Sequence, residues 1–169
     1  ISDSAGGGVA VAFEDVTERK EFEQNLKKLS QAVEQSPASI VITDPEGAIE
    51  YVNSKFCEVT GYTVEEALDQ NPRILKADSS DPELYQELWE TIKAGQDWHG
   101  EFQNKKKNGE LYWESASISP ILSSDGSIAY FLAIKEDITE RKWIDAELAQ
   151  KSILMKALID SPKDIIIFS

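Results

Sequence analysis

The side chains in this sequence that could do acid–base or nucleophilic chemistry are few and scattered. Glu101 and Glu114 fall on two neighbouring predicted strands, where their carboxyl groups could form a general acid–base pair. The single histidine, His99, begins a predicted strand, and the single cysteine, Cys57, lies on a short predicted helix. No nucleophile with a nearby base, no zinc-ligand spacing and no phosphate-binding glycine loop accompanies them. We therefore expect no catalytic or metal site, a surface histidine, and a small buried cysteine.

The charge and composition of the chain limit the kinds of molecule that it can bind. The 169 residues carry a net charge of −14, which repels nucleic-acid phosphates and anionic lipid, so we expect neither as a partner. The only basic run, Lys105–Lys107, precedes Asn108-Gly109, the dipeptide of a tight hairpin turn. No apolar run approaches the about 18 residues needed to cross a bilayer. One cysteine excludes an internal disulfide and fits a reducing compartment, so we expect a cytoplasmic protein.

A six-residue motif occurs twice and divides the chain. Asp15–Lys20 reads DVTERK, and Asp137–Lys142 reads DITERK. Each copy follows an apolar run and precedes a charged helical pattern that ends at Ser-Pro. Such repetition indicates repeated structural units. It predicts a terminal strand of a preceding unit (1–13), a linker helix (14–35), one complete domain (36–138), a C-terminal helix (139–160) and the start of a following unit (161–169).

The motif also predicts how each flanking helix begins. Asp15 with Glu18, and Asp137 with Glu140, have the spacing of a capping box, with Asp in place of Ser or Thr. We therefore expect each helix to start at its aspartate.

The linker helix carries a narrow apolar stripe. Its positions recur at intervals of four, three and four, which is typical of a short coiled coil. A helix lying on its own domain would show the same pattern, so both interpretations stay open. If the coiled coil forms, the chain is a homodimer whose contact residues are Phe22, Leu26, Leu29 and Val33.

The central domain has the element order strand–strand–helices–strand–strand–strand. Two strands in front and three behind can form one antiparallel sheet, with the helices covering one face, so we predict an α+β domain. Thr63 with Glu66, and Asp81 before Pro82, are helix-start signals within it. The expected strands are 40–44, 49–53, 98–104, 110–121 and 128–138, and the expected helical segments are 54–70, 71–75 and 81–95.

Several motifs in this order resemble the PAS sensory family with its C-terminal PAC motif. They are Asn53, Thr60–Tyr62, Trp98–Glu101, Lys107–Trp113 and Asp137–Thr139. The resemblance implies a five-stranded antiparallel sheet with a helix-lined pocket, flanked by N- and C-terminal signalling helices. It also implies a place in a multidomain bacterial signalling protein, beside neighbouring PAS units and an output domain such as a histidine kinase or a diguanylate cyclase.

The last strand runs into the second motif with no glycine or proline between Lys135 and Asp137, so strand and helix are nearly rigidly joined. We expect strain in the pocket to become helix motion at this joint. The predicted relay residues are Asp137, Thr139, Glu140 and Arg141.

Within this family the sequence departs from blue-light LOV domains. Asn71-Pro72 stands where those domains carry Asn-Cys, so the cysteine that would bond to flavin is missing. Glu114 stands where they use an amide, and Lys135 where they use a glutamine beside the flavin. The resemblance is therefore to a PAS domain that is not a photoactive LOV domain.

The pocket could hold FAD as a redox or oxygen sensor. Trp89 and Asn104 resemble positions that FAD-binding PAS domains use: an indole can stack on a flavin edge, and an amide can satisfy its mixed donors and acceptors. With Asn71 and Glu114 they are the expected cofactor-binding residues. The alternative is a cofactor-free dimerisation and relay module in which Trp89 is plain core and Asn104 pairs within its strand. Haem is not expected, because haem-binding PAS domains take their axial histidine from a pocket helix and His99 begins a strand.

Overall fold

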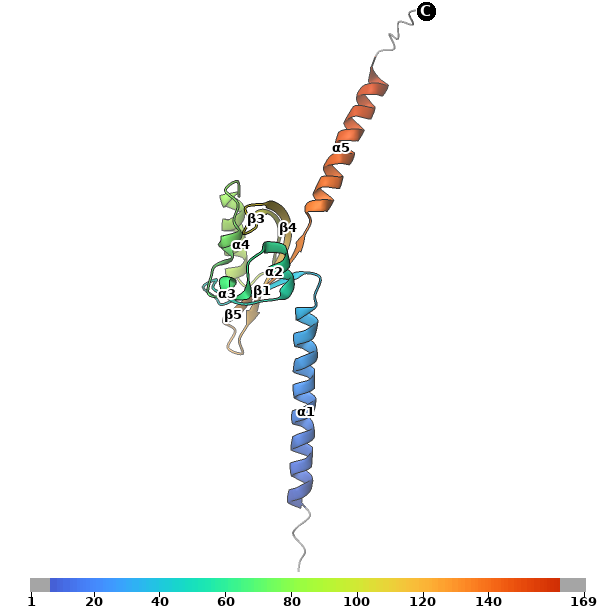
Figure 1. Cartoon of the computed structure of the whole chain (residues 1–169). Helices are drawn as coiled ribbons and strands as arrows, with labels where there is room; N and C mark the ends of the chain where they lie inside the picture. The colour runs from blue at the N-terminus through green and yellow to red at the C-terminus, as the bar shows by residue number, and fades with distance from the viewer. Residues whose placement is uncertain (1–6, 162–169) are drawn as a thin grey trace, which may run out of the picture.

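The computed structural model describes residues 7–161, and it contains one α+β domain between two long helices (Figure 1). The helices α1 and α5 project from the domain in different directions. The elements are α1 (Gly7–Glu34), β1 (Ser39–Thr43), β2 (Ile49–Val52), α2 (Ser54–Thr60), α3 (Val64–Ala67), the 3₁₀ helix η1 (Pro72–Leu75), α4 (Pro82–Lys93), β3 (Trp98–Lys105), β4 (Leu111–Leu122), β5 (Ile128–Asp137) and α5 (Thr139–Asp160).

The five strands form a single antiparallel sheet in the order β2-β1-β5-β4-β3. The first strand therefore pairs with the last one, Val41 opposite Ala133. The predicted fold class is confirmed: one antiparallel sheet, helices on one face, and a long helix at each end. The order of the strands was not part of that prediction.

Burial alternates along the strands, as a sheet covered on one side requires. In β5, Phe131, Ala133 and Lys135 are buried on the inner face, whereas Tyr130 and Ile134 are exposed on the outer face. Helices α2, α3 and α4 contact the sheet and cover its inner face. A space therefore remains between the helical layer and the inner faces of β1, β3, β4 and β5.

Local signals place the short helices. Thr63 and Glu66 form a reciprocal capping box at the start of α3, and the Asp81 side chain accepts a hydrogen bond from the Glu83 N–H at the start of α4. Gly61 ends α2 at a φ of 79°, in the left-handed region that glycine tolerates. The predicted caps at Thr63 and Asp81 are confirmed, because such caps depend only on residues one turn apart.

Asn53 joins α1 to the domain. Its fully buried side chain accepts hydrogen bonds from the N–H groups of Ile40 and Phe56, at 2.9 and 3.2 Å. Its amide nitrogen donates to the carbonyl oxygens of Val33 and Ala38, both at 3.0 Å. One amide thus ties together the end of α1, the start of β1 and the start of α2.

Two expectations about the N-terminal segment are wrong. Residues 9–13 form the first turns of α1 and not a strand, and Asp15 lies inside that helix and not at its start. A strand needs a neighbouring strand to satisfy its backbone groups, and none accompanies these residues in the described part of the chain. A helix satisfies the same groups internally, so it extends back to Gly7. The assignment of this segment to a preceding unit stays a prediction, and residues 162–169 of the predicted following unit lie outside the described residues.

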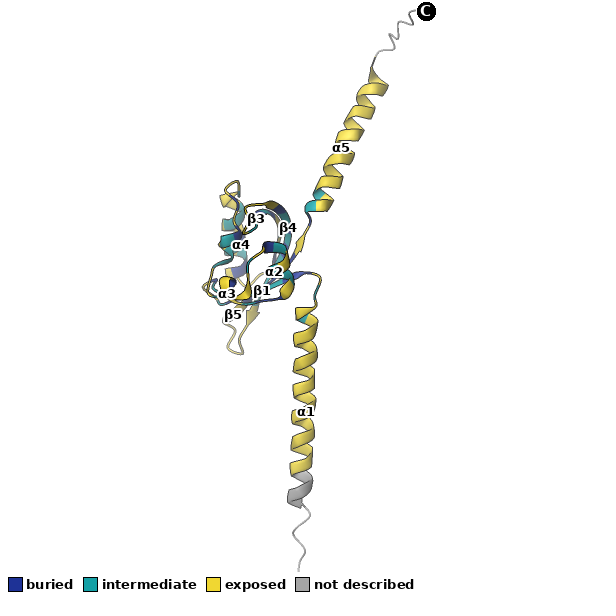
Figure 2. Cartoon of the chain, viewed as in Figure 1, coloured by how far each residue is buried: buried dark blue, intermediate teal, exposed yellow. Residues whose placement is uncertain are grey.

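Helix α1 projects away from the domain, and the apolar stripe along it is largely exposed (Figure 2). Phe22, Leu26 and Leu29 are 64%, 52% and 65% exposed, and Val33 at the domain end is half-buried. The interpretation in which this helix lies on its own domain is therefore wrong. No helix within residues 7–161 has the length and apolar character needed to cross a membrane.

Candidate ligand pocket and helix junction

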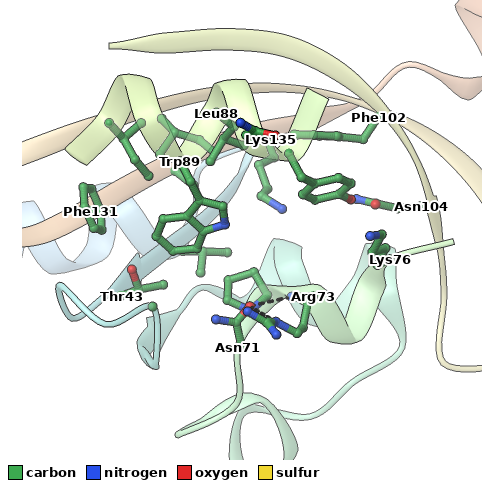
Figure 3. A pocket seen from close by; sticks show the side chains of 18 residues that line it. Thr43, Asn71, Arg73, Lys76, Leu88, Trp89, Phe102, Asn104, Phe131 and Lys135 are labelled. Carbon is green, nitrogen blue, oxygen red and sulfur yellow. Dashed lines mark hydrogen bonds between the residues drawn. The ribbon is translucent and has the colours of Figure 1, made fainter. Parts of the chain in front are cut away.

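A cavity of about 370 Å³ lies between the inner face of the sheet and the helices η1 and α4 (Figure 3). Its size falls within the range of small-molecule sites, and its walls are mainly apolar, as such sites are. Leu88, Trp89 and Ile92 line it from α4, Val41 and Thr43 from β1, Phe102 and Asn104 from β3, Ile118 from β4, and Phe131, Ala133 and Lys135 from β5.

Three of the four predicted cofactor-binding residues line this cavity: Trp89, Asn104 and Asn71. Trp89 points inward from α4, and its ring meets that of Phe131 edge-on, with centroids 6.1 Å apart and an interplanar angle of 86°. Such an edge-to-face pair holds the indole in one orientation at the centre of the cavity.

Asn104 has an unpaired buried atom. The residue is only 3% exposed, and its Oδ1 has no hydrogen-bond partner within the described structure. An unsatisfied buried acceptor costs about 1–3 kcal/mol, so this atom, in a residue that lines the cavity, calls for a physical explanation. The alternative was that the Asn104 side chain forms hydrogen bonds within its strand. Oδ1 forms no such bond in the described structure.

Asn71 has a different task. Its Oδ1 accepts hydrogen bonds from the backbone N–H and the Nε of Arg73, at 3.0 and 3.2 Å. It therefore starts η1 and aims the Arg73 guanidinium along the cavity wall (Figure 3). The side-chain oxygen of Asn71 is therefore already hydrogen-bonded within the protein.

Glu114, the fourth predicted cofactor-binding residue, does not line the cavity. It contacts Lys135, which does. Its Oε1 is 2.7 Å from Lys135 Nζ, an ion-pair distance, although Oε1 accepts no well-aligned hydrogen bond. Tyr112 donates its O–H to Glu114 Oε2 at 2.8 Å. Burial, followed by the nearby Glu114 charge, raises the pKa of Tyr112, so the phenol stays protonated and keeps donating.

The acid–base pair imagined for Glu101 and Glu114 does not exist. Phe102, and not Glu101, stands opposite Glu114 in the β3–β4 register, so the two carboxylates occupy opposite faces of the sheet. His99 is exposed at the start of β3, as predicted for a surface residue, and Cys57 is half-buried against the core. Burial raises the pKa of Cys57, which disfavours its reactive thiolate. Residues 7–161 contain no cluster of three side chains fit to hold a metal ion.

Sequence reasoning missed the cations of this pocket as ligand-facing groups. Arg73, Lys76 and Lys135 all line it. Arg73 lies in the Asn-Pro-Arg-Ile-Leu stretch already singled out, and Lys135 was noted as a departure from glutamine, so the signal was present for both.

The second copy of the repeated motif forms a joint with β4. The N–H of Ile138 donates to the Trp113 carbonyl oxygen at 2.9 Å. The Thr139 hydroxyl accepts from the Trp113 N–H at 2.9 Å and donates to Asp137 Oδ1 at 2.5 Å. Asp137 Oδ1 also accepts from the Thr139 N–H at 2.9 Å. One threonine thus connects the end of β5, the adjacent strand and the first turn of α5.

The capping box predicted between Asp137 and Glu140 is therefore wrong. The Asp137 carboxylate accepts a hydrogen bond from the N–H of Thr139, two residues later in the chain, which is a common arrangement of aspartate in turns. Helix α5 begins at Thr139, and its N-cap residue, Ile138, makes no side-chain cap.

The other two predicted relay residues make little contact with the described part of the domain. Glu140 makes no side-chain hydrogen bond or ion pair within residues 7–161, and Arg141 makes only an exposed contact of 3.9 Å with Asp145. Lys142, which sequence reasoning missed, forms an ion pair with Glu101 and lies 4.8 Å from the centroid of the Trp113 ring. The helix is thus held to the outer face of the sheet by Lys142.

A sequence profile of the PAS domain family matches residues 37–140, which is more than half of the chain. The chain belongs to the PAS domain family. The match covers the sheet, the pocket and the joint with α5. The PAS resemblance inferred from its motifs is thereby confirmed.

Similar curated proteins are sensory and regulatory. A nitrogen fixation regulatory protein of Klebsiella oxytoca is 35% identical over 76% of this chain and 26% of its own length. A blue-light-activated histidine kinase of Rhizobium johnstonii is 33% identical over 74% of the chain and 37% of its own length. The aerotaxis receptor of Escherichia coli is 31% identical over 69% and 22%. The chain therefore spans well under half of each of these relatives.

Solved structures with a similar fold include sensory domains. An RNA-binding Light-Oxygen-Voltage receptor superposes with a TM-score of 0.68 at 27% identity, over 76% of this chain and 37% of that one. The PAS domain of a protein from Colwellia psychrerythraea superposes with a TM-score of 0.59 at 26% identity, over 68% and 98%. The domain is thus a PAS sensory module of a kind found in larger signalling proteins.

Gly47 provides a test of the pocket wall. At its φ of 92°, an added Cβ would lie 2.8 Å from Asn71 Nδ2 and 2.9 Å from Trp89 Cη2, whereas one at Gly109, with a φ of 90°, would meet nothing within 4 Å. Both Gly→Ala changes carry a similar backbone cost of about 1–2 kcal/mol, because both positions have a positive φ. We expect Gly47→Ala to lose about 1–2 kcal/mol more in urea unfolding, because Trp89 and Asn71 must move. Equal losses in the two variants would show that this wall is loose.

Proposed function

We propose that this PAS module binds a flavin, FAD, in the cavity beneath α4 and passes the state of that ligand through β5 into α5. The observation that carries the proposal is the unpaired Oδ1 of Asn104, buried beside an apolar cavity of about 370 Å³. A ring system with both apolar surface and N–H donors would satisfy this site, and a flavin has both.

The residues present fit such a ligand. Asn104 would accept from a ring N–H, and Trp89 would pack against the ring. Arg73 and Lys76, exposed cations at the cavity wall, would bind the anionic phosphates of FAD. When bound, a flavin supplies reversible electron uptake, which suits redox or oxygen sensing. The name of one relative, the aerotaxis receptor of Escherichia coli, agrees with oxygen sensing.

The proposal excludes cysteinyl–flavin photochemistry. Pro72, which replaces the LOV cysteine, lines the cavity, and the single Cys57 lies on α2 outside it. The chain has no thiol at the pocket to bond with a flavin, although it resembles blue-light-activated kinases. A redox state of the ligand, and not a light-driven bond, is the proposed signal.

The flavin proposal is tested by spectroscopy. After incubation with excess FAD and removal of unbound ligand, the protein should show flavin bands in its visible spectrum. Asn104→Ala removes the acceptor and should weaken FAD binding about tenfold, while Asn108→Ala, in an exposed turn, should leave it unchanged. A spectrum without flavin bands would contradict the proposal.

The proposed relay is centred on Asp137 and Thr139. Their hydrogen bonds couple β5 and the Trp113 backbone of β4 to the first turn of α5, so a movement of β5 reaches the helix directly. Glu140 and Arg141 have no buried contact in this domain, so their proposed relay role is limited to contacts with neighbouring helices.

Thr139→Val tests the relay joint. Valine keeps the volume but removes the hydroxyl, leaving the Trp113 N–H unpaired, at a cost of about 1 kcal/mol. We expect faster amide exchange in the first turns of α5 and at Trp113, with the sheet core unchanged. Thr91→Val is the control, since its hydroxyl donates only to the Glu87 carbonyl oxygen, within α4. Unchanged exchange in α5 would show that Thr139 does not hold the joint.

The second proposed role is homodimerisation, because α1 carries exposed Phe22, Leu26 and Leu29, with Val33 at its base. A helix with unburied apolar residues gains stability by pairing with a second copy. Neighbouring PAS units, a kinase or diguanylate cyclase output domain and a cytoplasmic location are proposed on the same footing, from the repeat, the relatives and the lone cysteine.

Leu26→Glu tests the dimer. Introducing charge into the apolar stripe should lower the association constant of the fragment at least tenfold, measured by sedimentation equilibrium. Gln31→Glu adds the same charge at another exposed position of the helix and should change association less. A fragment that is monomeric throughout the accessible concentration range would contradict dimerisation through α1.

A further inference from the structure

The charged residues that line the cavity are all cations. They are Arg73, Lys76 and Lys135, and no carboxylate of residues 7–161 lines the cavity with them. This is unusual in a chain whose net charge is −14, where chance placement favours carboxylates. Arg73 and Lys76 are exposed, so water screens them. Lys135 is the one that is buried, at 6% exposure.

Lys135 retains donors for a ligand. An ammonium has three N–H groups, and Glu114, whose Oε1 is at 2.7 Å, is the only carboxylate that the described residues bring within ion-pair distance. The remaining donors belong to a side chain that lines the cavity. The pair itself is expensive to bury, because two desolvated charges recover their hydration energy only with good geometry and further hydrogen bonds. Glu114 has such support from Tyr112, and Lys135 has room for it on the cavity side.

The cavity thus offers two different polar groups among apolar walls. Asn104 Oδ1 requires a donor, and Lys135 requires an acceptor that is preferably anionic. A ligand that satisfies both is planar and mainly apolar, with a donor on one edge and negative charge on another.

We propose that Lys135 determines the charge of the ligand, so that the pocket selects planar apolar molecules with an anionic group, and that this group competes with Glu114 for the Lys135 ammonium. The proposal rests on the cavity being the ligand site of the proposed function, but not on that ligand being FAD. It assigns Lys135 as the specificity-determining residue of the pocket.

Such competition would act directly on the α5 joint. Lys135 is two residues before Asp137, and Glu114 stands opposite Asp137 in the β4–β5 register. The residue before Glu114, Trp113, holds Ile138 and Thr139 through its backbone. A ligand that draws Lys135 away from Glu114 therefore loosens the two strands at the point where they hold the helix.

Two fluorescent probes with the same aromatic skeleton distinguish the contribution of ligand charge to binding from that of apolar contact. Anilinonaphthalene sulfonate is anionic, and N-phenyl-naphthylamine lacks the sulfonate and is neutral. Lys135→Gln with Glu114→Gln removes both buried charges together, which avoids leaving one charge unpaired. We expect this double variant to bind the anionic probe about tenfold more weakly and the neutral probe unchanged.

Matched variants complete the test. Glu114→Gln alone frees the ammonium and should strengthen anionic binding several-fold. Lys55→Gln removes a half-buried lysine on α2, which does not line the cavity, and should change neither probe. Ala133→Leu fills part of the cavity and should weaken both probes, which places them in it. Urea unfolding of each variant establishes that it is folded at the assay temperature.

Equal weakening of both probes in the double variant, or anionic binding that does not change, would overturn the proposal. So would a wild-type protein that binds neither probe, or probes that Ala133→Leu does not affect. A spectrum without flavin bands would instead overturn the FAD assignment alone, because the probe measurements do not involve FAD.

Discussion

The pairing of the first strand with the last is the constraint on which this domain depends. Val41 stands opposite Ala133, and Ser39 opposite Lys135, so the two ends of the domain are neighbours in the middle of the sheet. All the helices between them must then lie on one face, since the chain leaves the sheet after β2 and returns at β3 on its other edge. The cavity is the space that this crossing leaves above β1 and β5. The pairing of β1 with β5 also places the end of β5, where the chain continues into α5, at the centre of the sheet and next to the pocket.

The interior of this pocket is not built for stability alone. A buried Lys135–Glu114 pair contributes little net stability compared with apolar residues of similar volume, because desolvation offsets most of the attraction. The unpaired Oδ1 of Asn104 is a further cost of about 1–3 kcal/mol. Asn104 and Lys135, which are both costly in the folded state, line the same cavity, and the ligand proposal rests on them. The apolar clusters on either side provide the stability that makes this possible.

The two long helices are attached in different ways. At the end of α1, Glu34 accepts hydrogen bonds from the Tyr51 hydroxyl and the Ser54 N–H, beside the buried Asn53 amide. Burial and the Glu34 carboxylate raise the pKa of Tyr51 to about 12, so this contact keeps its proton at neutral pH. At the start of α5, the attachment is a strand that continues into the helix. In the first motif copy the Thr17 hydroxyl bonds back to Phe13 within the helix, whereas Thr139 of the second copy bonds across to β4. Identical residues thus form a helix interior in one place and a joint in the other.

The sequence by itself determined the type and approximate bounds of the elements of residues 36–138, the caps at Thr63 and Asp81, the apolar stripe of α1, and the absence of a thiol beside Asn71. These features depend on residues within one or two turns of each other, so their signals are local. Only the tertiary structure decided the strand order, the burial of Lys135 against Glu114, the separation of Glu101 from Glu114, and the start of α5 at Thr139. Each of these depends on which distant strand provides the partner: β4 supplies the Trp113 backbone that Thr139 binds, and β5 supplies the lysine that Glu114 meets. Local spacing does not encode that choice, because burial of the whole inner face selects it.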